Sequence, residues 1–103
     1  MTTKRGLGIE EIISNKREDI VRLATKHGAF DVRVFGSVAR GEADLDSDLD
    51  LLVNWDYEHI SPWGGVELDM ELEALLGRKV DVVSEKGLYW YIRDRVLKEA
   101  IPL

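Results

Sequence analysis

Residues 48–53 read DLDLLV and place two aspartates at the start of an apolar run. Side chains two apart on a strand leave the same face, so Asp48 and Asp50 would share one face. The apolar residues on the opposite face would point toward the core: Leu49, Leu51 and Val53. Two carboxylates about 5 Å apart repel by about 3 kcal/mol at an effective dielectric constant of about 20. Because the chain keeps this repulsion beside a buried strand, we expect the charge to hold a divalent metal ion.

A Gly-Ser pair precedes the two aspartates, with ten residues between Ser37 and Asp48. Gly36 follows an alternating apolar run and opens what reads as a helical turn. Free backbone N–H groups at such a turn suit phosphate oxygens, and glycine allows close approach of the backbone. The sequence therefore predicts a phosphate-binding turn beside an acidic metal site that suits magnesium or manganese.

Asp81 is a third carboxylate of interest, because it interrupts the apolar run of residues 79–83. An aspartate there is costly unless it is paired or bound to a metal. If this strand lies beside residues 48–53, Asp81 would face the same site. Two plainer interpretations stay open: the Asp48–Asp50 pair is solvated, and Asp81 is a strand-end acid paired with an arginine or lysine.

Three better-known motifs do not fit this stretch. A P-loop would need a lysine after Gly41, where the chain has Glu42. An EF-hand starting at Asp44 would need a glutamate at its twelfth position, which is Trp55. A dinucleotide-binding fingerprint would need three closely spaced glycines, and only two are present here.

Composition narrows the class of protein. At 103 residues the chain is expected to form one domain, residues 1–103. It has no cysteine, so disulfides and thiolate zinc sites are excluded. The net charge of −6 argues against binding to duplex nucleic acid. The absence of a long apolar run or signal-like N-terminus predicts a cytoplasmic protein without membrane association.

The periodicity predicts an α/β fold in the order helix, strand, strand, helix, strand, helix. Residues 36–41 would form a tight turn, with Ser37 as the N-cap of one helical turn. The expected helices are residues 9–27, 66–77 and 88–100, the strands are 30–35, 48–53 and 79–83, and the loops are 42–47 and 54–65. In the first strand, Phe30, Val32 and Val34 would share one side. We therefore expect a three-stranded mixed sheet with helices packed on it.

Some residues admit less specific interpretations. His27 is expected at a helix C-terminus, and His59 in a loop, neither with a metal-binding partner nearby. Arg40 is as compatible with a surface arginine as with a ligand-binding one. Three tryptophans are expected to be core or interface residues, with nucleotide stacking as the alternative: Trp55, Trp63 and Trp90.

Taken together, the run G-S-x-A-R-G, then S-D-x-D-L, then a later aspartate on a short strand, resembles the DNA polymerase β-type nucleotidyltransferase superfamily. The matching residues are Gly36, Ser37, Ala39, Arg40, Gly41, Ser47, Asp48, Asp50, Leu51 and Asp81. The small size narrows the resemblance to the minimal nucleotidyltransferases (MNT), many of which are antitoxins of HEPN–MNT toxin–antitoxin pairs.

The resemblance implies transfer of AMP from ATP to a tyrosine hydroxyl of a partner HEPN ribonuclease toxin. It implies that Asp48, Asp50 and Asp81 are catalytic and bind two Mg²⁺ ions. It also implies that the nucleotide is bound by Gly36, Ser37, Arg40 and Ser47. Two alternatives remain: an antitoxin that neutralises its partner by contact alone, and transfer of a nucleotide to a small molecule or an RNA end. The aromatic residues of the last helix favour the contact interpretation: Tyr89, Trp90 and Tyr91.

Overall fold

The computed structural model describes residues 6–60 and 64–103 of the chain. The helices are α1 (Ile9–Ile13), α2 (Arg17–Lys26), α3 (Gly36–Ala39), α4 (Gly64–Leu76) and α5 (Trp90–Glu99), with the short 3-10 helices η1 (Ser14–Lys16) and η2 (Glu85–Gly87). The strands are β1 (Ala29–Phe35), β2 (Leu49–Trp55), β3 (Val80–Ser84) and β4 (Ile101–Pro102). Within these residues no helix has the length and apolar content that crossing a bilayer requires.

The strands form a mixed sheet in the order β3-β2-β1-β4. β2 pairs antiparallel with β1 and parallel with β3, and β4 pairs antiparallel with β1. The α/β fold is confirmed. The sheet has a fourth strand, β4, in addition to the three that were expected. That strand has only two residues, one of them proline, so no alternation in the sequence could mark it.

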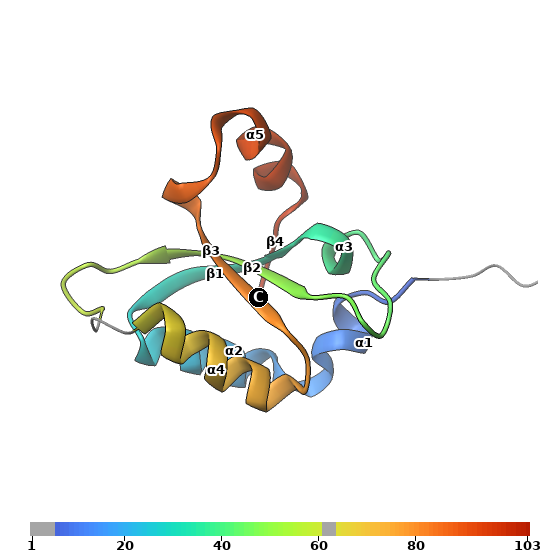
Figure 1. Ribbon diagram of the computed structural model, residues 1–103, viewed down its shortest axis with the longest axis horizontal. Helices are drawn as coiled ribbons and strands as arrows, with labels where there is room; N and C mark the ends of the chain where they lie inside the picture. The colour runs from blue at the N-terminus through green and yellow to red at the C-terminus, as the bar shows by residue number, and fades with distance from the viewer. Residues whose placement is uncertain (1–5, 61–63) are drawn as a thin grey trace, which may run out of the picture.

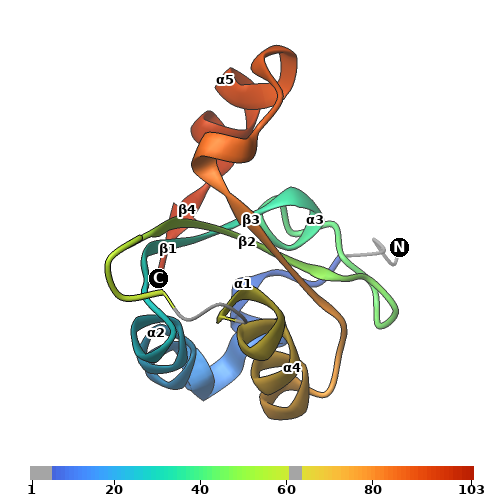
Figure 2. The same ribbon diagram turned by 60° about the vertical axis from the view of Figure 1, so that its left-hand side comes forward.

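Helices α2 and α4 lie on one side of the sheet, and α5 stands on the other (Figure 1 and Figure 2). The three inward-facing residues of β2 are fully buried in the core, as the alternation predicted: Leu49, Leu51 and Val53. α2 and α4 supply buried partners to the same core: Ile20, Ala24, Leu68 and Leu72. α4 ends before Gly77, whose φ of +66° suits glycine, as expected from the sequence.

The helix predicted over residues 9–27 is broken into α1, η1 and α2. Ser14 has a φ of +55°, and Asn15 has non-helical backbone angles. Serine and asparagine side chains compete for nearby backbone groups and so favour helix ends over helix interiors. The apolar spacing continues across this break, and periodicity alone therefore missed it. His27 is the C-cap of α2, as predicted, but it is buried and forms a hydrogen bond with Glu71 of α4.

The prediction that Phe30 shares one side of β1 with Val32 and Val34 was wrong, because Phe30 is 49% exposed whereas Val32 and Val34 are buried. The register between β1 and β2 shifts between Phe30 and Arg33, and Asp31 has a φ of +53°. A bulge of this kind adds a residue to one strand and turns the side chains before it to the other face. Ala29 is buried in place of Phe30.

Candidate functional site

Asp50 and Asp81 are direct register partners on the parallel strands β2 and β3. Paired residues on neighbouring strands present their side chains to the same face of the sheet. Phe35, the last residue of β1, pairs with Asp50 from the other side. The sheet thus places two carboxylates side by side, next to the point where β1 runs into α3.

Asp50 carries the strongest electrostatic signal of the predicted acids. Burial, and after it the charges of Asp81 and Asp48, raise the pKa of Asp50 from its usual 3.8 to about 6. Asp48 lies immediately before β2 rather than within it. The charges of Asp48 and Asp81 therefore act on Asp50, which like Asp48 is partly buried, whereas Asp81 is exposed.

Gly36 brings the start of α3 against the Asp50 carboxylate. Its φ is +76°, and a Cβ atom at this position would overlap Asp50 Oδ2. Glycine is therefore required here both by the backbone angle and by the close approach. The expectation that Ser37 caps this turn was wrong, because the N-cap is Phe35 and Ser37 lies inside α3. The first N–H groups of α3 have no partner within the helix.

The turn at Gly36 contacts a residue that the sequence did not single out. The Gly36 N–H donates to Glu99 Oε2 at 2.6 Å, from the last residue of α5. Arg40 Nη1 donates to both oxygens of Glu99, at 3.1 and 3.2 Å, and Arg40 Nε donates to Glu42 at 2.9 Å. These hydrogen bonds raise the pKa of Arg40, Glu42 contributing more than Glu99. A glutamate at a helix end carries no sequence signal that would have revealed this role.

Ser47, expected to bind nucleotide, takes part in a turn before Asp48. The Asp44 N–H donates to Ser47 Oγ at 2.9 Å, and Ser47 Oγ lies 3.1 Å from Asp44 Oδ1. Arg78 Nη1 donates to the Ser47 carbonyl at 2.7 Å. By contrast, no group in the described part of the chain forms a hydrogen bond with the Ser37 hydroxyl. Of the two serines, Ser37 therefore has the hydroxyl that a ligand can reach without breaking a contact.

Asp81 forms none of the ion pairs found among residues 6–60 and 64–103, so an arginine or lysine partner does not account for it. A further acid, Asp69 of α4, lies near it. Burial, and then the charges of Asp81 and Glu73, raise the pKa of Asp69 to about 6. Asp69 Oδ1 is buried without a hydrogen-bond partner in the described structure. No pattern in the sequence distinguishes Asp69 from the other acids of α4.

The acidic side chains fit a divalent ion chemically. All the candidate ligands are carboxylate oxygens, which hard cations prefer. Burial, and after it the neighbouring negative charges, raise the pKa of Asp50, and a bound cation would offset both effects. The oxygens of Asp48, Asp50 and Asp81 do not all lie within 4.8 Å of one another, whereas a different set of side chains among the described residues does. An ion shared by all three would require at least one side chain to rotate.

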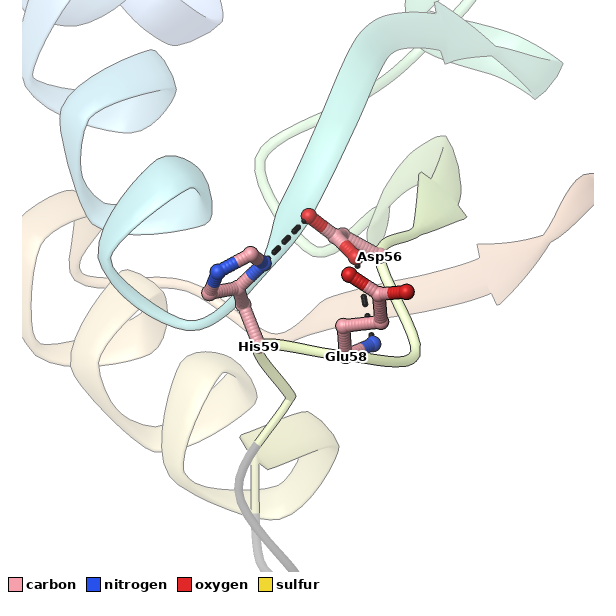
Figure 3. A group of neighbouring side chains, drawn as sticks. All are labelled: Asp56, Glu58 and His59. Atoms are coloured by element: carbon pink, nitrogen blue, oxygen red, sulfur yellow. Dashed lines mark hydrogen bonds and ion pairs between the residues drawn. The ribbon is translucent and has the colours of Figure 1, made fainter.

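That different set is Asp56, Glu58 and His59, in the exposed loop after β2 (Figure 3). His59 Nδ1 lies 2.6 Å from Asp56 Oδ2, and the Glu58 N–H donates to Asp56 Oδ1 at 3.1 Å. The expectation that His59 has no metal-binding partner nearby was therefore wrong. The hydrogen bonds that the Asp56 carboxylate accepts account for this arrangement as a side-chain-stabilised turn.

The tryptophans occupy different environments. Trp55 is partly buried and packs against the core, as expected, whereas Trp90 is 85% exposed. Trp63 lies outside the described residues. Trp90 is therefore not a core residue, and it stands between the exposed Tyr89 and Tyr91 at the start of α5.

Known proteins are similar to the chain in sequence and in fold. A family model described as nucleotidyltransferase domain matches residues 13–103. The protein adenylyltransferase MntA of Thermococcus cleftensis is 43% identical over 96 residues, which cover 92% of this chain and 95% of the relative. A protein of Methanocaldococcus jannaschii, provisionally named a protein adenylyltransferase, is 37% identical over 89 residues, covering 86% of this chain and 95% of that protein.

Two solved structures have a similar fold. One, provisionally described as a minimal nucleotidyltransferase, has a TM-score of 0.81 at 50% identity and covers 94% of this chain and 97% of the other. A toxin–antitoxin structure with AMP-PNP has a TM-score of 0.69 at 20% identity, covering 84% and 70%, and so supports the fold alone. With its acids on adjacent parallel strands beside a glycine-serine turn, the chain has the minimal nucleotidyltransferase fold and belongs to the nucleotidyltransferase domain family, as a relative of the protein adenylyltransferases.

Proposed function

We propose that the chain transfers AMP from ATP to a tyrosine hydroxyl of a partner HEPN-type ribonuclease toxin, and so acts as its antitoxin. The observation that carries this proposal is the register of Asp50 with Asp81, beside the Gly36 turn. The names of the relatives, protein adenylyltransferase and toxin–antitoxin, support the reaction and the kind of partner.

In the proposed reaction, the acceptor oxygen attacks the α-phosphorus of ATP. The bond from that phosphorus to its bridging oxygen breaks, and pyrophosphate leaves with the electron pair. A tyrosine hydroxyl has a pKa of about 10, so loss of its proton near neutral pH needs assistance. Asp81 is exposed and makes no ion pair among the described residues, so it is suited to orient the hydroxyl and accept the proton.

Asp48, Asp50 and Asp81 would hold two Mg²⁺ ions, which when bound stabilise the attacking and leaving oxygens electrostatically. Gly36 and Ser37 would bind the terminal phosphates through their N–H groups and the Ser37 hydroxyl. Arg40 would neutralise phosphate charge, and Ser47 would position Asp48 through the turn that it stabilises. Most of the rate enhancement would come from positioning and electrostatics.

The test is transfer of label from α-labelled ATP to the partner, with Mg²⁺ present. We expect transfer by the wild type and none by Asp48→Ala/Asp50→Ala. Asp94→Asn is a matched control, because it removes an exposed carboxylate of α5. Absence of transfer by the wild type, or equal transfer by the double variant, would rule out the proposed reaction.

A second candidate function is neutralisation by contact alone. It is favoured by the exposure of Tyr89, Trp90 and Tyr91, which are 67%, 85% and 67% exposed. Exposed aromatic clusters are typical of protein interfaces. If Asp48→Ala/Asp50→Ala still protected cells from the toxin while Trp90→Ala did not, contact would be the function and catalysis would be secondary.

A further inference from the structure

The carboxylate of Glu99 lies at the turn to which the proposed function assigns the nucleotide phosphates. It is held by one backbone N–H, from Gly36, and by the guanidinium of Arg40. Its side chain is only 17% exposed. A backbone N–H at a helix start together with a guanidinium is a donor set that also recognises phosphate oxygens.

The position of Glu99 is electrostatically unfavourable for the neighbouring acids. Its charge acts on Asp50 in the same direction as the charges of Asp81 and Asp48, and only Arg40 opposes them. The carboxylate is therefore better explained by the donors it satisfies than by the acids beside it.

We propose that Glu99 is a resident anion of the Gly36 turn, and that the phosphates of a nucleotide must displace it to bind. The inference rests on the proposed function, because it assigns those phosphates to Gly36 and Arg40. One N–H cannot donate fully to a carboxylate and to a phosphate at once. Glu99 thereby reduces the apparent affinity for nucleotide in proportion to the fraction of molecules in which the turn is free of Glu99.

The attachment of α5 is compatible with this displacement. Val96 is the buried residue of that helix, whereas α2 and α4 each contribute a buried apolar stripe to the core. An element with few buried contacts has a low free energy of local opening. Release of the Glu99 side chain therefore does not require any change in the core between the sheet, α2 and α4.

The test measures binding of Mg-ATP and of inorganic tripolyphosphate to the full chain, for the wild type and Glu99→Gln. Glutamine has the same shape and still accepts the Gly36 N–H, but it carries no charge. We expect Glu99→Gln to bind both compounds about tenfold more tightly, the order expected for loss of one charge-assisted hydrogen bond. Asp94→Asn, which removes a charge from the same helix, should bind as the wild type does.

Glu42→Gln separates two explanations of tighter binding. It releases Arg40 from its other carboxylate but leaves Glu99 on Gly36. If Glu42→Gln tightened binding as much as Glu99→Gln, the effect would come from Arg40 alone, and the inference would be wrong. Equal or weaker binding by a folded Glu99→Gln would also overturn it.

A measurement on the unmodified chain avoids any dependence on the folding of variants. In an NMR titration with tripolyphosphate, the amides of Gly36 and Ala100 should shift with one midpoint, because Glu99 leaves as the anion arrives. A shift at Gly36 with no change at Ala100 would overturn the inference. Tighter binding by Glu99→Gln, together with no AMP transfer by the wild type, would refute the proposed function and leave the inference standing. Failure of both the wild type and Glu99→Gln to bind either compound would refute both.

Discussion

The two faces of β2 are built for different purposes. On one face Leu49, Leu51 and Val53 are at most 1% exposed and pack in the core with α2 and α4. On the other face Asp50 is partly buried beside Asp81, and its pKa is raised to about 6. The packed face fixes the register of the strand, and that register determines which carboxylates meet on the opposite face. Stability and the proposed chemistry should therefore respond to different substitutions along one strand.

The largest expected effect is the loss of AMP transfer when the carboxylate on the acidic face of β2 is removed. Asp50→Asn should lower AMP transfer at least about 100-fold, because it removes a charged ligand from the site. It should not lower the free energy of unfolding, since repulsion with Asp48 and Asp81 is relieved. Labelled transfer and urea unfolding measure the two quantities. A large loss of stability without loss of transfer would reverse the roles assigned to the faces.

Leu51→Ala examines the packed face. It should lower the free energy of unfolding by about 2–5 kcal/mol, because it leaves a cavity where part of a fully buried side chain was. Transfer per folded molecule should change much less than in Asp50→Asn. Urea denaturation gives the first value, and transfer measured well below the unfolding midpoint gives the second. A destabilisation under about 1 kcal/mol would mean that this face is not the closely packed one.

Two glycines with similar backbone angles sharpen the contrast between site and scaffold. Gly36→Ala should cost about 1–3 kcal/mol of stability and displace Asp50, because the added Cβ overlaps its carboxylate. Gly77→Ala has the same kind of backbone strain, at φ +66°, with nothing within 4 Å of the added atom. It should cost about 1–2 kcal/mol and leave transfer unchanged. Equal transfer by the two variants would contradict the close approach of Gly36 to Asp50.

The smallest effect is a pH dependence of stability. The raised pKa of Asp50 means that the folded chain binds more protons than the unfolded chain between about pH 3.8 and 6. This contribution therefore destabilises the fold as pH rises through that window and is complete above it. Asp69 acts in the same direction. Unfolding at pH 5 and pH 7 should show a smaller gain on acidification for Asp50→Asn than for wild type, and an equal gain would contradict the shift at Asp50.

Local patterns in the sequence predicted the packed face well, because alternation and helical spacing record burial directly. The apolar residues of β2 and α4 are examples. Contacts that depend on the pairing of distant segments could not be predicted with the same success. The meeting of Asp50 with Asp81 follows from the parallel register of β2 and β3, which the sequence allowed but did not require.

Three features that the sequence did not reveal have the same origin. The bulge at Asp31, the strand β4 and the contact of Glu99 with Gly36 each depend on how segments far apart in sequence are brought together. None changes the local apolar spacing. The motif from Gly36 to Asp50 could be found because its residues are close in the chain, whereas Glu99 and Asp69 join its surroundings only in the folded state.

The most direct test of the account is to locate a paramagnetic divalent ion on the folded chain. In the presence of ATP, substoichiometric Mn²⁺ should broaden the amide signals around Asp48, Asp50 and Asp81, together with those of the Gly36 turn. Broadening confined to the loop of Asp56, Glu58 and His59, with the β2 and β3 acids unaffected, would contradict it.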